Sequence, residues 1–134
     1  MSRFGSFFWR GLLLVAAADA AVAGGWAAVR PADLFTLFQY PANDDGLLLC
    51  RLLGALYLTY ALFLALAVYR PAAFGGLTLA PFLGRLILCG VWLWLLGSGR
   101  MSAAANALLA LLTHDAVWPP VFAGFLWSHR QASV

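Results

Sequence analysis

Apolar residues fill four long stretches of the chain, which are separated by charges and turn-forming residues. The stretches cover about residues 7–29, 47–69, 77–96 and 103–127. Each is long enough to cross a bilayer core of about 30 Å, for which a helix needs roughly 20 residues. Runs such as Val91–Leu96 do not alternate apolar and polar positions, as the strands of a membrane barrel would. The pattern therefore predicts four transmembrane helices.

The connection between the first two stretches predicts a further short helix. From Pro31 to Phe38, the apolar residues at positions 34, 35, 37 and 38 fall on one helical face, and Tyr40-Pro41 ends the run. Asp33 is placed to cap the start of this helix. We expect an interfacial helix on the outer membrane surface. It is either an anchored loop or a lid over an outward-facing cavity.

Composition agrees with an integral membrane protein. Of the 134 residues, 64% are hydrophobic and only 10% are charged, whereas a soluble domain has roughly 45–50% apolar and about 25% charged residues. The aromatic content of 15% also argues against disorder, since disordered chains are poor in aromatic residues. We expect an all-α, integral membrane four-helix bundle with a short interfacial helix. The whole chain, residues 1–134, forms a single transmembrane domain.

The arginines predict the orientation of this bundle. With four spans, Arg3, Arg10, Arg70 and Arg130 lie on one side of the membrane. Arg30 and Arg100 lie on the other side with the loop aspartates. Because cytoplasmic loops carry the excess of basic residues, both termini are expected in the cytoplasm.

The start of the chain has two interpretations. Arg3 and Arg10 precede a short apolar run, and Ala21-Val22-Ala23 resembles a signal-peptide cleavage site. However, Asp19 would then end the hydrophobic core of the signal, and the apolar sequence continues to Val29. We expect this segment to be retained as a membrane helix.

Each apolar stretch contains an ionisable residue, namely Asp19, Arg51, Arg85 and Asp115. Such residues are costly in a membrane and usually face the bundle interior. Since consecutive helices joined by short loops are antiparallel neighbours, we predict that Asp115 pairs with Arg85 and Asp19 with Arg51. These pairs either fix the packing of the helices or form a polar pocket. Such a pocket could bind a lipid head group or a quinone carbonyl, or could relay a proton.

The fourth stretch is interrupted beside His114 and Asp115. In an α-helix, Pro119 cannot donate to the Asp115 carbonyl, and Pro120 cannot donate to the Ala116 carbonyl. Irregular backbone at this depth is tolerated where it is buried in protein or lines a cavity. We expect a kink that opens a polar cavity between the third and fourth spans. His114 then either packs through a hydrogen bond or belongs to the site.

Other chemistries find no support in the sequence. Fifteen residues separate His114 from His129, roughly 22 Å along a helix, so the two cannot share a metal or a haem within one chain. Cys50 and Cys89 have neither redox nor zinc spacing and are expected to pack as small hydrophobes. The net charge of +3 is spread along the chain without a basic run, so no nucleic-acid partner is expected. We predict no metal, no cofactor and no catalytic residue.

Several short motifs resemble a known family. Arg51-Leu52-Leu53-Gly54 opens the second stretch, which ends in Tyr69-Arg70-Pro71. Gly84-Arg85-Leu86 and Asp115-Ala116-Val117-Trp118 lie in the third and fourth stretches. Together they resemble the DoxX-like group of small four-helix bacterial membrane proteins, over most of the chain. The resemblance implies a bundle in the bacterial inner membrane. Some members of that group are membrane subunits of quinone-linked oxidoreductases.

Three functions follow as hypotheses. The first is an accessory or partner-binding subunit of a larger, possibly quinone-linked, membrane assembly, with no catalytic activity of its own. It rests on the near absence of extramembrane sequence and on Trp92 and Trp94, which need lipid or protein neighbours. The second is a quinone- or lipid-binding enzyme component that uses Arg85, His114 and Asp115. The third is a small transporter, which would have to form a homo-oligomer to alternate access.

Overall fold

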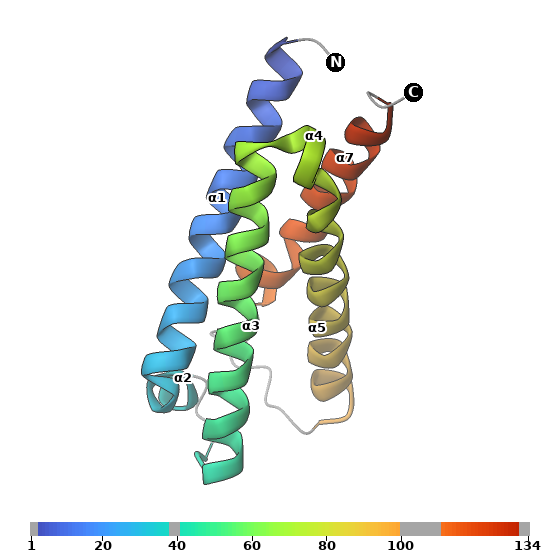
Figure 1. Cartoon of the computed structure of the whole chain (residues 1–134). Coiled ribbons are helices and arrows are strands. Elements are labelled where there is room, and N and C mark those ends of the chain that lie inside the picture. The colour runs from blue at the N-terminus through green and yellow to red at the C-terminus, as the bar shows by residue number, and fades with distance from the viewer. Residues whose placement is uncertain (1–2, 38–40, 100–110, 132–134) are drawn as a thin grey trace.

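The computed structural model describes residues 3–37, 41–99 and 111–131, and all regular structure in these ranges is helical. Phe38, Arg100 and residues 103–110 of the predicted fourth span lie outside the described ranges. The long helices are α1 (Arg3–Val29), α3 (Asp44–Tyr69), α5 (Leu79–Gly97) and α7 (Trp118–Gln131). The described ranges also contain four short elements: α2 (Pro31–Leu37), α4 (Pro71–Phe74), the 3₁₀ turn η1 (Gly75–Thr78) and the π-helical turn η2 (Leu111–Ala116). The N- and C-terminal ends lie at the same end of the molecule (Figure 1).

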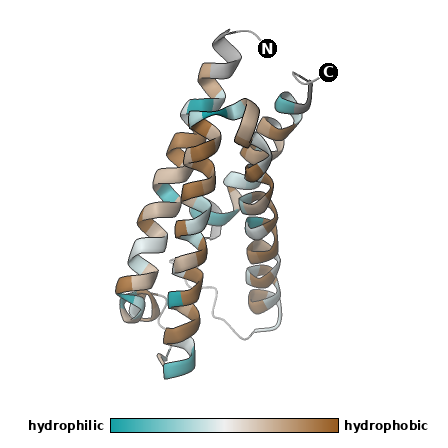
Figure 2. Cartoon of the chain, in the orientation of Figure 1, coloured by the Kyte–Doolittle hydropathy of each residue, from teal (hydrophilic) through white to brown (hydrophobic). Residues whose placement is uncertain are grey.

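Three segments of the described chain are helical and are long and apolar enough to cross a membrane, as expected for three of the four predicted spans. They are Phe7–Val29, Asp44–Tyr69 and Pro71–Gly97. Hydrophobic residues extend along most of α1, α3 and α5 (Figure 2). Many of them point outward, as shown by the exposed fractions of Val22 (72%) and Ile87 (67%). An exposed apolar surface of this extent requires lipid or protein around it.

The predicted fourth span is divided at Val117. The turn η2 ends at Ala116, Val117 forms a bend, and α7 begins at Trp118 with the two prolines in its first turn. Proline is tolerated there because the first N–H groups of a helix have no partner within the helix. The prolines therefore start a new helix, which explains the predicted kink.

Helices α1 and α3 pack closely through glycine. A Cβ atom added to Gly54 of α3 would lie 2.5 Å from the Ala28 backbone nitrogen and 2.7 Å from the Gly24 carbonyl oxygen of α1. Small residues permit such approach of helices in lipid. The small residues Gly24 and Ala28 of the first apolar stretch therefore lie at the contact between α1 and α3.

The packed core occupies only part of the bundle length. One buried cluster joins α1, α3 and α7 and includes Leu13, Leu64 and Phe122. A second cluster contains Ala20, Tyr57 and Tyr60. Along α1, Asp19 lies between the core residues Ala17 and Ala20, so the polar site is set within the core. Beyond this level the helices enclose a cavity.

Candidate functional site

Arg85 of α5 is the centre of a polar cluster inside the bundle. Its side chain is 2% exposed. Nη1 donates to Asp115 Oδ1 at 2.8 Å, and Nη2 donates to Asp19 Oδ2 at 3.2 Å. Nη1 also donates to the backbone carbonyl of His114. We call this group and its hydrogen-bonded neighbours the Arg85 cluster; it consists of Asp19, Tyr57, Arg85, Trp92, His114, Asp115 and Trp118.

The predicted Asp115–Arg85 pair is confirmed, but the predicted Asp19–Arg51 pair is wrong. Asp19 binds Arg85 instead, and Arg51 is exposed on α3. The reason is the position of Arg51 along and around α3. It precedes Tyr57, which reaches the cluster, by six residues, or about 9 Å of rise and roughly 120° of rotation.

Three neutral side chains that were not predicted from the sequence also donate hydrogen bonds to the two aspartates. Tyr57 Oη donates to Asp115 Oδ1 at 2.6 Å, and Trp92 Nε1 donates to Asp115 Oδ2 at 3.0 Å. Trp118 Nε1 donates to Asp19 Oδ2 at 2.8 Å. Buried charges require such partners. In the described part of the chain, no buried side-chain nitrogen or oxygen lacks a hydrogen bond.

A signal for one of these donors exists in the sequence. Trp92 follows Arg85 by seven residues, so the two residues lie on the same face of α5 two turns apart. Trp92 therefore turns inward, although the sequence analysis placed it with Trp94 on an outer surface. Trp94 does lie outside, with 56% of its surface exposed.

His114 joins the cluster through one ring nitrogen. Nδ1 lies 3.0 Å from Oδ1 and 2.9 Å from Oδ2 of Asp19. The ring stacks on Tyr57 at a centroid distance of 5.1 Å, and the Arg85 guanidinium lies 4.4 Å from the centroid of the same Tyr57 ring. Tyr57 therefore fixes both the imidazole and the guanidinium, in addition to donating to Asp115.

The hydrogen bond to the His114 carbonyl follows from the π-helical turn. In a π-helix the N–H of a residue binds the carbonyl five positions earlier. Pro119 occupies that position for His114 and has no N–H, so Arg85 supplies the donor. α-Helical spacing would free the Asp115 carbonyl first, but the π-helical spacing of η2 frees the His114 carbonyl, one residue earlier.

Because the freed carbonyl belongs to His114, replacing Pro119 and replacing Pro120 by Ala should give new amides with different hydrogen-exchange rates. In Pro119→Ala, the new amide can donate to the His114 carbonyl, and its hydrogen exchange should be roughly five- to tenfold slower than that of the amide in Pro120→Ala. Pro119 is buried and Pro120 is exposed, so the second variant serves as the matched control. Amide exchange followed by mass spectrometry measures the difference. Equal exchange rates would contradict the assignment of the freed carbonyl to His114.

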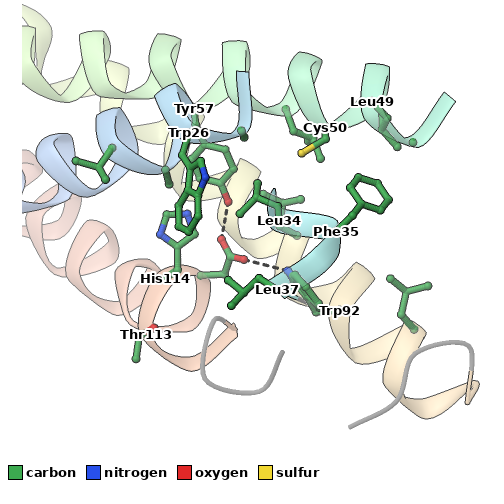
Figure 3. A pocket seen from close by; sticks show the side chains of 18 of the residues that line it. Trp26, Leu34, Phe35, Leu37, Leu49, Cys50, Tyr57, Trp92, Thr113 and His114 are labelled. Atoms are coloured by element: carbon green, nitrogen blue, oxygen red, sulfur yellow. Dashed lines mark hydrogen bonds between the residues drawn. The ribbon is translucent and has the colours of Figure 1, made fainter. Parts of the chain in front are cut away.

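A cavity of about 740 Å³ begins at the Arg85 cluster (Figure 3). Asp19, His114 and Asp115 lie in its wall, and the rest of the lining is mostly apolar or aromatic. The lining includes Trp26, Phe35, Leu49, Cys50, Leu53 and Leu88. Ligand sites usually have about 300–1,000 Å³, apolar walls and a few placed polar groups. This cavity has the size and the lining of such a site.

The predicted cavity lay only between the third and fourth spans, but α1, α2 and α3 also contribute to its walls. Leu34, Phe35 and Leu37 of α2 all line it, so α2 is placed as the predicted lid would be. Asp33 lies in the first turn of α2 and pairs with Arg30, with 2.8 Å between Oδ2 and Nε. It therefore does not occupy the capping position, because the helix already begins at Pro31.

The cysteines and the other side chains that could bind a metal ion form no further site in the described ranges. Cys50 and Cys89 are free thiols of intermediate burial, and Cys50 lines the cavity. Within the described ranges, no three His, Cys, Asp or Glu side chains are grouped to hold a metal ion.

Comparison with known proteins adds no relative: no protein-family model, no curated protein and no solved structure matches the chain. The resemblance to the DoxX-like group therefore stays a prediction.

Proposed function

We propose that this chain is a multi-pass membrane protein that binds an amphipathic small molecule, a quinone or a lipid, inside the bundle. The observation that carries this proposal is the cavity of about 740 Å³, whose walls are mostly apolar and whose inner end is the Arg85 cluster. An apolar ligand body fits the walls, and a polar head group fits the inner end.

The exposure of the charged side chains supports ligand binding over a purely structural role. The side chains of Arg85 and Asp115 are 2% and 5% exposed, so they are almost fully buried, although Asp115 contributes to the cavity wall. Asp19 and His114 are 30% and 23% exposed, and both line the cavity. We infer that the Arg85–Asp115 pair holds the helices together and that the Asp19–His114 pair faces the ligand.

We also propose a four-span topology with both termini in the cytoplasm, in a bacterial inner membrane. The common position of the two chain ends (Figure 1) and the distribution of arginines support it. In this topology α2, which lines the cavity, faces the opposite, outer side of the membrane.

The proposal predicts that the protein carries a ligand through gentle purification. Organic extraction followed by mass spectrometry should find about one quinone or lipid molecule per chain. Ala23→Phe places a ring in the cavity wall and should abolish this retention. Ala21→Phe is the matched control, because Ala21 is exposed on the same helix and does not line the cavity.

Two results would contradict the proposal. Equal retention by both variants would place the bound molecule outside the cavity. An empty wild-type protein that copurifies with one stoichiometric enzyme complex would favour the accessory-subunit hypothesis. In that case, the exposed apolar faces of the helices would be the functional surface.

A further inference from the structure

We propose that the cavity selects ligands whose head group donates a hydrogen bond, and that Nε2 of His114 accepts it. The ligand class is a neutral amphiphile headed by a hydroxyl group, on an aromatic ring or on a lipid alcohol. This inference rests on the proposed function and specifies the ligand of the same site.

The first step is the tautomer of His114. Asp19 receives hydrogen bonds from Arg85 at 3.2 Å and Trp118 at 2.8 Å, so its carboxylate acts as an acceptor. A carboxylate accepts only, and the ring nitrogen that faces it must therefore carry the hydrogen. Nδ1 of His114 is that nitrogen. In the neutral ring, Nε2 is then an acceptor with a lone pair.

The second step is the accessibility of Nε2. In the described structure the hydrogen bonds of the His114 side chain run only through Nδ1. No side-chain nitrogen in the described ranges is both sealed and without a partner, so Nε2 retains accessible surface. His114 lines the cavity, and its stacking on Tyr57 fixes the plane of the ring. A ligand therefore meets an oriented, unoccupied acceptor.

The third step excludes anionic head groups. Both terminal nitrogens of Arg85 are engaged by carboxylates, and one of them also by the His114 carbonyl. The described cavity lining contains no Arg and no Lys, and it contains Asp19 and Asp115. A carboxylate or phosphate head group would meet two negative charges without an available cation. The site therefore favours neutral molecules.

The fourth step separates hydroxyl from carbonyl or ether head groups. The Tyr57 hydroxyl and the indole N–H groups of Trp92 and Trp118 donate to the aspartates. At the Arg85 cluster, a head group that only accepts would face the lone pair of Nε2, and the neighbouring donors are already engaged by the aspartates. A hydroxyl donates to it directly. For a quinone-type ligand, the hydroxylated reduced form is thus preferred over the carbonyl form.

The experiment uses the full chain in phosphatidylcholine nanodiscs, with empty nanodiscs to measure partitioning into lipid. The probes are 4-octylphenol and 4-octylanisole, which differ only in that a methyl group replaces the donor hydrogen. Octylphenol should bind about tenfold more tightly, the value of one good hydrogen bond. Monooctanoylglycerol tests a lipid alcohol as the source of the hydroxyl, and decanoate should show no saturable binding.

Two variants assign the selectivity to one atom. His114→Phe keeps an aromatic ring on Tyr57 but removes Nε2, and should bind octylphenol and octylanisole equally. His129→Phe is the matched control, since His129 stacks on Phe125 outside the cavity lining and should leave the preference unchanged. If His114→Phe does not fold, the comparison of the two probes on the wild-type protein still decides whether a donor is preferred.

The outcomes separate this inference from the function on which it rests. Equal binding of octylphenol and octylanisole, abolished by Ala23→Phe, would overturn the selectivity and keep the cavity as a ligand site. Tighter binding of decanoate would overturn the exclusion of anions. Failure of every probe to bind saturably would overturn both proposals. Saturable, His114-dependent binding of monooctanoylglycerol alone would support the hydroxyl class with a lipid source.

Discussion

Replacing Arg85 by Leu should destabilise the protein more than any other single substitution in the described chain. The change leaves Asp19 and Asp115 without their shared cation and the His114 carbonyl without its donor. Removing one partner of a buried ion pair costs about 3–5 kcal/mol in soluble proteins, and here two carboxylates lose theirs. Unfolding in mixed detergent micelles measures the loss. Arg51→Leu is the matched control, because Arg51 is exposed, and its effect should be within about 0.5 kcal/mol.

A double variant tests the pairing itself. In Arg85→Leu with Asp115→Leu, the sealed carboxylate is removed together with its cation. Asp19 keeps the hydrogen bonds from His114 and Trp118. We expect the double variant to recover part of the lost stability. A double variant that is no more stable than Arg85→Leu alone would show that the contact between Arg85 and Asp115 is not the dominant pair.

Gly54→Ala should produce the second large effect, by separating α1 from α3. The new methyl group would lie within 3.0 Å of three backbone atoms of α1, so the helix itself must move. Overpacking of this kind costs roughly 1–3 kcal/mol. Gly90→Ala on α5 is the control, because its added Cβ has no atom within 4 Å, and its higher helix propensity should stabilise by up to about 1 kcal/mol. Equal stability of the two variants would contradict the close approach of α1 and α3.

The ends of the helices could be predicted well because proline acts locally. Arg30-Pro31 and Arg70-Pro71 mark the ends of α1 at Val29 and α3 at Tyr69, since proline disfavours helical geometry in the preceding residue. The start of α3 was placed three residues late. Asn43 caps it, with its side-chain oxygen accepting from the Gly46 amide at 2.7 Å, so the polar residues predicted as a turn begin the helix.

The candidate site could be predicted only in part, because depth in the membrane is easier to read from a sequence than rotation about a helix axis. Counted from the ends of the apolar stretches at about 1.5 Å per residue, Asp19, Arg85 and Asp115 come to a similar level, and the three side chains do meet. The rotation of α3, which turns Tyr57 toward the cluster and Arg51 away from it, depends on the packing of Gly54 against α1. The cavity was not predictable in volume, because it is the space that several helices leave between them.

The hydrogen bond from Arg85 to the His114 carbonyl also bears on how the chain enters a bilayer. Helix α7 has 14 residues, about 21 Å of rise, so it cannot by itself cross an apolar core of about 30 Å. A fourth crossing therefore has to include η2, whose His114 carbonyl finds its donor on α5 rather than within its own segment. Exposed to lipid alone, that carbonyl would be left without a partner. In the proposed four-span topology, α5 and the last segment would therefore be expected to insert as one helical hairpin, with Arg85 paired to Asp115 as it enters the membrane.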